Sequence, residues 1–147
     1  MYHQCMTSKV NVTQKIKYAL MLICGLNFSF AYAQIPSTKY SEGLAFISGG
    51  VGESESEAIL AEAKYWPLLL ELSQLEQGRG VWIFGAQVQI FNMMQQSVFD
   101  ALSDGPYILI NLKPGQYRIQ ASYQGVLQTK AVEILADESK KLSIFWK

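Results

Sequence analysis

The sequence predicts a mainly β fold, an antiparallel sandwich of six or seven strands preceded by one α-helix. Three observations support this class. Apolar and polar residues alternate at a period of two through much of residues 67–147, as they do in half-buried strands. Glycine, proline and aspartate separate these runs at short, regular intervals. The one helix-like segment precedes the strands and does not alternate with them, which argues against a parallel α/β sheet.

Residues 1–33 have the pattern of an export signal. A stretch with three lysines precedes an uncharged apolar run at 18–30, and Ala31-Tyr32-Ala33 supplies the small residues of a cleavage site. We therefore predict cleavage after Ala33, with Ser29-Phe30-Ala31 as a second candidate site. A permanent anchor is disfavoured because a membrane-spanning helix needs about 20 apolar residues. The expected location is periplasmic or secreted, with no transmembrane anchor after cleavage.

Removal of this segment would take away the single histidine, His3, and both cysteines, Cys5 and Cys24. A mature chain starting at Gln34 then has no group for a Ser-His-Asp triad, a cysteine nucleophile, a thiolate or imidazole zinc site, or a disulfide. The chain has 12 basic and 12 acidic residues, and three lysines leave with the signal, so the mature chain is acidic. Its basic residues are scattered. No nucleic-acid partner, metal or cofactor is expected.

Residues 34–66 are predicted to form a lead-in segment and the helix, ahead of a sandwich domain at 67–147. Gln34–Glu42 is polar and aperiodic, which favours a flexible lead-in. The apolar run at 44–47 has the length of a short strand, and the glycines within 49–52 interrupt it.

The helix is expected over residues 54–66. Ser54 and Glu57 have the spacing of a capping box, in which each side chain satisfies a free backbone N–H. Pro67 disfavours helical geometry in the residue before it, so the helix should end near Tyr65. Apolar side chains recur on one face of this segment at i, i+4 and i+7. They are Ile59, Ala63 and Trp66. We expect this face to pack on the sandwich, the alternative being a contact with a partner.

The sandwich strands follow in order from Pro67. They are predicted at 67–73, 82–90, 97–102, 107–112, 117–123, 126–134 and 142–146. Turn-forming residues lie between most of them, as at Gln124-Gly125. The segment 107–112 is apolar on both faces, as expected for a central strand. Five apolar residues alternate along one predicted face of strand 82–90. They are Trp82, Phe84, Ala86, Val88 and Ile90.

Two short motifs resemble those of a known family. The first is Asp104-Gly105-Pro106-Tyr107, and the second is Leu112-Lys113-Pro114-Gly115-Gln116-Tyr117. The chain from about residue 67 resembles the transthyretin-like, carboxypeptidase regulatory-like domains of small secreted proteobacterial proteins. The resemblance implies a seven-stranded Greek-key sandwich that acts as an accessory, spacer or binding module and not as a catalyst. Within it, Pro114-Gly115 is expected to close a hairpin between two core strands.

Exposed aromatic side chains are the best candidates for a ligand surface, and the candidates are Tyr65, Tyr107 and Tyr123. Trp82, Tyr117 and Trp146 lie on apolar faces and are expected in the core. The glutamates of the helix start are expected to be solvated rather than to bind metal. Asp100 and Asp104 are the best-placed carboxylates for a small hydrolase, a reading that we rank below a binding role.

These observations predict an exported, non-catalytic binding or structural module. The favoured role is a protein-interaction domain of the bacterial periplasm or envelope, with an envelope protein as partner. The alternative is a carbohydrate-binding module that uses exposed aromatics to bind a polysaccharide.

The first prediction concerns the export signal. When the full chain is expressed in a bacterial host, the intact mass of the exported protein should correspond to a chain beginning at Gln34. A mature protein that retains residues 1–33 would contradict the cleavage and, with it, the loss of histidine and cysteine.

Overall fold

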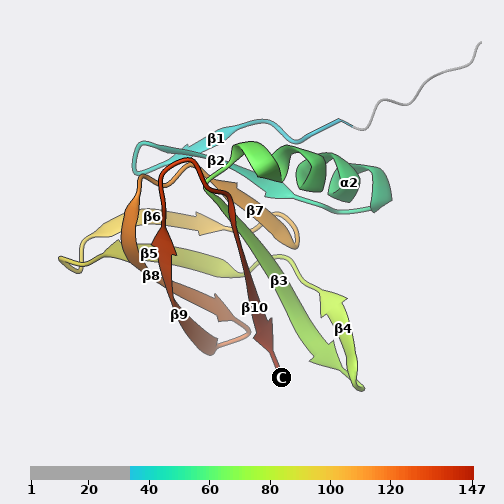
Figure 1. Ribbon diagram of the computed structural model, residues 1–147. Coiled ribbons are helices and arrows are strands. Elements are labelled where there is room, and N and C mark those ends of the chain that lie inside the picture. Colours follow the sequence, from blue (N-terminus) through green and yellow to red (C-terminus); the bar gives the residue numbers. More distant parts are fainter. Residues whose placement is uncertain (1–33) are drawn as a thin grey trace, which may run out of the picture. The chain divides into compact units, whose positions relative to one another are not determined.

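The computed structural model describes residues 34–147, and the predicted export signal lies outside the described residues. Within residues 34–147 the chain forms two β-sheets and one α-helix, α2 (Glu53–Glu62), which continues into the 3-10 turn η2 (Ala63–Tyr65). Figure 1 shows the helix lying against strands of one sheet. The prediction of a mainly β sandwich with one helix is confirmed.

The larger sheet, sheet A, has the strand order β1-β2-β7-β3-β10, and β4 also pairs with β3. These strands are β1 (Lys39–Ser41), β2 (Leu44–Gly49), β3 (Leu68–Glu76), β4 (Arg79–Trp82), β7 (Tyr107–Ile110) and β10 (Lys140–Trp146). Strand β7 lies between β2 and β3, which confirms its predicted central place. The sandwich thus includes two strands that precede the helix, and one of them, β1, lies in the segment expected to be a flexible lead-in.

One strand pair of sheet A is parallel. Strand β10 runs beside β3 in the same direction, with Lys140 opposite Leu68. The expectation of a wholly antiparallel sandwich is wrong at this pair. Its cause is the connection after sheet B, which returns the chain to the start of β3, where the Lys140 N–H donates to the Pro67 carbonyl at 2.9 Å.

The smaller sheet, sheet B, has the order β6-β5-β8-β9 and is antiparallel throughout. Its strands are β5 (Gln87–Asn92), β6 (Ser97–Leu102), β8 (Gly115–Tyr123) and β9 (Val126–Ile134). The predicted turn at Gln124-Gly125 joins β8 to β9, and both residues have positive φ, 48° and 80°. This is the conformation of the two-residue turns that suit the twist of a hairpin.

The two sheets pack face to face around one core. Leu68, Leu70 and Leu72 of β3 point inward at the predicted period of two, and Ile119 and Ala121 of β8 meet them from the other sheet. Burying each leucine or isoleucine side chain contributes on the order of 1.5–3 kcal/mol.

Helix α2 covers part of the outer face of sheet A. Ile59 and Ala63 are buried against a second apolar cluster that includes Ile47, Leu69 and Leu109. The predicted stripe of the helix therefore packs on the sandwich, as expected. Since α2 covers the outer face of β7 and sheet B covers its inner face, every residue of β7 is buried.

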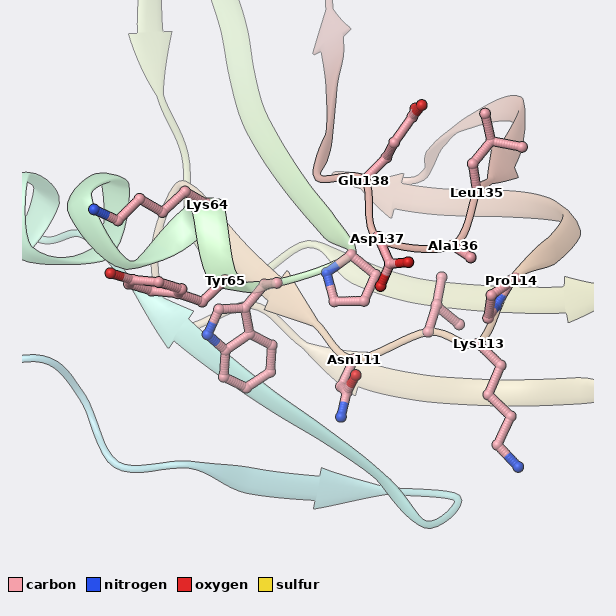
Figure 2. Close-up of a pocket in the computed structure, with 12 residues that line it drawn as sticks. Lys64, Tyr65, Asn111, Lys113, Pro114, Leu135, Ala136, Asp137 and Glu138 are labelled. Atoms are coloured by element: carbon pink, nitrogen blue, oxygen red, sulfur yellow. The ribbon is translucent and has the colours of Figure 1, made fainter.

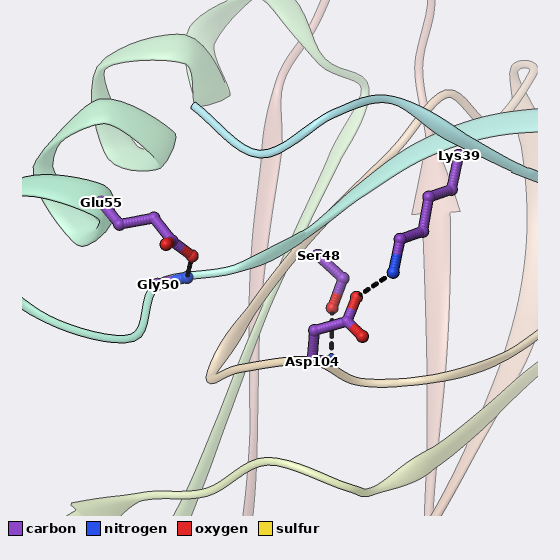
Figure 3. A network of polar contacts seen from close by, with 5 residues as sticks. All are labelled: Lys39, Ser48, Gly50, Glu55 and Asp104. Carbon is purple, nitrogen blue, oxygen red and sulfur yellow. Dashed lines mark hydrogen bonds and ion pairs between the residues drawn. The ribbon is translucent and has the colours of Figure 1, made fainter. Parts of the chain in front are cut away.

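The start of the helix differs from the prediction. The helix begins at Glu53, one residue before its predicted start, Gly52 is its N-cap, and no side chain caps it. Glu55 reaches back instead, and its Oε1 accepts a hydrogen bond from the Gly50 N–H at 2.7 Å (Figure 3). The Ser56 hydroxyl donates to the Gly50 carbonyl at 2.8 Å. The capping box is wrong because these two residues, and not Ser54, hold the glycine segment onto the first turn.

Two strand predictions also need correction. The predicted strand 82–90 is the end of β4 followed, after a break, by β5 in the other sheet. Pro114-Gly115 does not close a hairpin, because β7 and β8 belong to different sheets and the connection crosses between them. Turn chemistry shows where the chain bends, but it does not determine which strands pair.

The second prediction concerns Gly105, which lies directly against the backbone of Gly49. A methyl group at Gly105 would overlap the Gly49 carbonyl, whereas one at Gly80 would meet nothing within 4 Å. Gly105→Ala should lower the free energy of unfolding by about 1–3 kcal/mol, the usual cost of overpacking. Gly80→Ala is the matched control and should change it by less than about 0.5 kcal/mol. Urea denaturation measures both, and equal midpoints would contradict the close approach.

Candidate functional site

The three tyrosines predicted to bind a ligand have different surroundings. Tyr107 is 2% exposed, so its predicted exposure is wrong. Its ring lies beneath Trp82, with the ring centres 5.7 Å apart. Tyr123 is half-buried against Trp146, at 5.8 Å. Tyr65 is 71% exposed, and the Lys64 ammonium lies 4.8 Å from its ring centre.

Tyr65 lines a groove of about 460 Å³ at one end of the sandwich (Figure 2). Its walls are the end of η2, the connection between β7 and β8, and the turn between β9 and β10. Figure 2 shows the Lys113 and Glu138 side chains pointing in opposite directions, away from the groove. These two charged groups therefore do not converge, and convergence of polar groups is what orients a ligand in a specific pocket.

The residues of the two motifs that resemble a known family make hydrogen bonds, an ion pair and core contacts within the fold. The Asp104 N–H donates to Ser48 Oγ at 2.8 Å, and its carboxylate pairs with Lys39 at 2.6 Å (Figure 3). Leu112 is buried in the main core. Tyr117 was predicted in the core and is half-buried, packed against the main core. Its hydroxyl donates to the Lys113 carbonyl at 2.9 Å. Pro114 borders the groove of Figure 2, and Gly115 starts β8.

The carboxylates of the described residues do not assemble a metal centre. In residues 34–147, no group of three or more His, Cys, Asp and Glu side chains could hold a metal ion. The Asp100 carboxylate accepts hydrogen bonds from the side-chain amides of Gln87 and Gln89 on the neighbouring strand. In that same part of the chain, no helix is both long and apolar enough to cross a membrane.

The outer face of sheet A is exposed where α2 does not cover it. Register places Trp82 of β4, Ser73 of β3 and Phe145 of β10 opposite one another in one row across three strands. Trp82 is 56% exposed and Phe145 is 50% exposed, with the small Ser73 between them. Leu75, 46% exposed, lies two residues further along β3. These four residues form what we call the open face.

Two strand spacings of about 4.8 Å separate the outer strands of this row, so the two aromatic residues lie on strands about 10 Å apart. Such an uncovered set of apolar side chains marks an interaction surface more often than an isolated exposed residue does.

Strand β4 also has a free edge. It pairs with β3 alone in the described residues, and all four of its residues are exposed. Gln77 and Gly78 form a two-residue turn with positive φ at both positions. The pair next to such a turn, Glu76 and Arg79, is hydrogen-bonded, and bonded and non-bonded pairs then alternate. The backbone N–H and C=O groups of Gly80 and Trp82 therefore point away from β3.

Glu71 forms the polar border between α2 and the open face. Its Oε2 accepts from Ser143 Oγ at 2.9 Å and pairs with Lys141 Nζ at 2.9 Å. Burial raises the pKa of the Glu71 carboxyl, but the hydrogen bonds from Lys141 and Ser143 and the charge of Lys141 together bring that pKa below its usual value.

Sequence reasoning missed Trp82 and Phe145 as surface residues. The sequence predicts Trp82 in the core because its spacing matches that of Ala86, Val88 and Ile90. Ile83, and not Trp82, is the core residue that follows β4. The alternation of inward side chains therefore shifts by one residue between Ile83 and Ala86. Gly85, with φ of 77°, lies at this change. A glycine inside a strand pattern is the one signal that could have indicated it. Trp146 is 2% exposed, and its core prediction is confirmed.

A scan against protein-family models finds no match to this chain, and a search of curated proteins finds none either.

The third prediction concerns the pH dependence that Glu71 contributes. The pKa of Glu71 is lower in the folded chain, so its ionised form stabilises the fold above an unfolded-chain pKa of about 4.3 and loses this effect as the pH falls through the folded value. Glu71→Gln should therefore lower the melting temperature at about pH 6 more than at about pH 3. Ser143→Ala removes one hydrogen bond and should have an intermediate effect. An equal deficit of Glu71→Gln at both pH values would contradict this role.

Proposed function

We propose that the protein is an exported, non-catalytic interaction module of the bacterial periplasm or envelope, which binds an extended segment of a partner protein by strand addition at β4. The observation that carries the proposal is the free edge of β4 beside the open face. In this mode a peptide adds a strand to a sheet edge, so that main-chain hydrogen bonds supply affinity and alternate side chains supply specificity.

The chemistry of β4 supports strand addition. Natural sheet edges are commonly protected by lysine, proline, bulges or a covering segment. The three residues Gly80-Val81-Trp82 have neither charge nor proline, and Gly80 has no side chain to obstruct an approaching backbone. The outward backbone groups of Gly80 and Trp82 offer two donors and two acceptors to a new strand.

The open face favours an apolar partner segment. Side chains of an added strand alternate between the two faces of the sheet, so every second one would lie on the Trp82 side. There it would contact the indole ring, with Phe145 beyond Ser73. We therefore expect a partner segment with β-branched or aromatic residues at alternate positions.

The other edges of the sandwich are less accessible. On one side the Ser41 hydroxyl of β1 donates to the Asp100 carbonyl of β6 at 2.7 Å, which links the two edge strands. On the other side the Trp146 indole of β10 donates to the Val126 carbonyl of β9 at 2.8 Å. These contacts tie the outer strands of the two sheets together and leave β4 as the accessible edge that we propose.

The fourth prediction uses two substitutions at Gly80. Gly80→Pro removes the outward N–H, whereas Gly80→Ala keeps it, and neither touches a hydrogen bond between β3 and β4. Extended peptides selected for binding the wild-type protein should bind Gly80→Ala about as well and bind Gly80→Pro at least about tenfold more weakly in fluorescence polarisation.

Both variants should keep the circular dichroism spectrum of the wild type, which separates loss of binding from loss of folding. Equal binding by all three proteins, or a selection that enriches no peptide, would contradict strand addition at β4.

A further inference from the structure

A second surface lies on sheet B, away from β4. A groove of about 540 Å³ runs over the outer ends of β5, β8 and β9. The turn between β5 and β6 forms one of its walls. It is lined by Asn92, Met93, Gln95, Gln116, Arg118 and Glu133, together with the apolar residues Tyr117, Ala131 and Val132. Its volume is in the range of small-molecule sites.

Arg118 is held at the centre of this groove. Register places Phe91, Arg118 and Ala131 in one row across β5, β8 and β9. The guanidinium lies 5.4 Å from the centre of the Phe91 ring, a cation–π distance. On the other side of the row Ala131 has only a methyl group, which leaves open space beside Arg118.

The wall turn is fixed by its own hydrogen bonds. Asn92 Oδ1 accepts from the backbone N–H groups of Met94 and Gln96, each at 3.0 Å. This holds Gln95 over β8, where its side-chain oxygen accepts a hydrogen bond from Arg118 Nη2. Gln95 is exposed and has a φ of 61°, which is uncommon outside glycine.

One donor of the guanidinium is unsatisfied. Arg118 Nε is buried and has no hydrogen-bond partner among the described residues. Buried donors are nearly always paired, so this one needs a physical reason. The fork of Nε and Nη2 has the geometry that binds a carboxylate with two parallel hydrogen bonds. Gln95 occupies one arm of the fork with a neutral oxygen.

We propose that this groove binds a sugar acid, a hexuronate residue, with its carboxylate on Arg118. The carboxylate displaces the Gln95 oxygen from Nη2 and accepts from Nε as well, which exchanges one hydrogen bond to a neutral oxygen for two to a charged carboxylate. This site goes beyond the strand-addition role and lies in the other sheet.

The rest of the groove fits the rest of such a ring. Glu133 and Gln116 lie opposite each other in the next row of the sheet, two residues from Arg118 along β8. The Glu133 carboxylate accepts hydrogen bonds from hydroxyl groups, and the Gln116 amide both donates and accepts. Ala131 and Met93 offer an apolar surface to the C–H groups of the ring. A second acidic group on the ligand would be repelled by Glu133, which favours one carboxylate and several neutral hydroxyls.

An amino acid is the main competitor, because its ammonium would be attracted to Glu133. An ammonium has three donors and no acceptor, however, so it would leave the N–H groups of the neighbouring Gln95 and Gln116 amides without a partner. Hydroxyl groups can reorient to accept from these amides, and an ammonium cannot.

The test is an NMR titration of ¹⁵N-labelled protein with D-galacturonate, D-galactose, acetate and L-alanine. Galacturonate should shift the Arg118 Nε–H signal and the backbone amides of Gln116, Ala131 and Glu133. Galactose lacks the carboxylate and acetate lacks the ring, so each should bind at least about tenfold more weakly. Acetate binding as tightly as galacturonate, tighter binding of alanine, or the absence of any shift at Arg118 would overturn the proposal.

Three variants complete the test. Arg118→Lys keeps the charge and loses the fork, so galacturonate affinity should fall at least about tenfold. Arg79→Lys, the same exchange on β4, is the matched control and should leave that affinity unchanged. Gln116→Ala alters an exposed side chain and should weaken galacturonate binding without affecting folding. Unchanged affinity in Arg118→Lys would overturn the proposal. Because Gly80 lies outside this groove, failure here leaves strand addition at β4 separately testable.

Discussion

Strand β7 has four consecutive buried residues, and this requirement for cover on both faces organises the molecule. Sheet B covers the inner face, so the outer face needs a second cover, which α2 supplies through Ile59 and Ala63. The helix can lie this close because the chain before it is glycine. Gly50 packs against the Tyr107 ring, and the backbone of Gly49 lies directly against Gly105. A Cβ at Gly49 would overlap the Glu55 carboxylate and crowd Ile59, so a side chain there would force the helix away from its sheet.

The same arrangement produces the open face, which we propose as an interaction surface. Helix α2 is ten residues long and covers β2, β7 and the first part of β3, whereas β3 and β10 extend further. The uncovered part of sheet A therefore carries Trp82 and Phe145 on its outside, with Glu71 marking the border. Exposed apolar side chains gathered on one face are typical of interaction surfaces, which supports the proposed partner.

Much of the fold could be predicted because short-range patterns determine it. The alternation of Leu68, Leu70 and Leu72 predicted an inward face, and Gln124-Gly125 predicted a turn, which joins β8 to β9. These features depend on residues close in sequence. The sheet order depends on contacts between distant residues, and no local pattern encodes the parallel pairing of β10 with β3.

The candidate sites were harder to predict for a related reason. The exposure of a side chain depends on which strands lie next to it, and a local pattern does not give this. The sequence predicts Tyr107 at the surface and Trp82 in the core, whereas Tyr107 is buried beneath an exposed Trp82. The inward series of side chains shifts by one residue near Gly85, which puts Trp82 on the outer face of sheet A, over the Tyr107 ring. The Arg118 groove could not be predicted either, because it depends on the row of Phe91, Arg118 and Ala131 across three strands.

The parallel pair has a consequence for the order of folding. Glu71 and Ser143, which meet across it, are 72 residues apart in sequence. Contacts of such long range require a large loop to close first, which slows folding. Sheet A also has no strand to cover this side of β3 until residues 140–146 have been synthesised. In a chain emerging from the ribosome, β3 therefore lacks its β10 partner until translation of the described residues is nearly finished. We expect sheet A to complete its pairing only then.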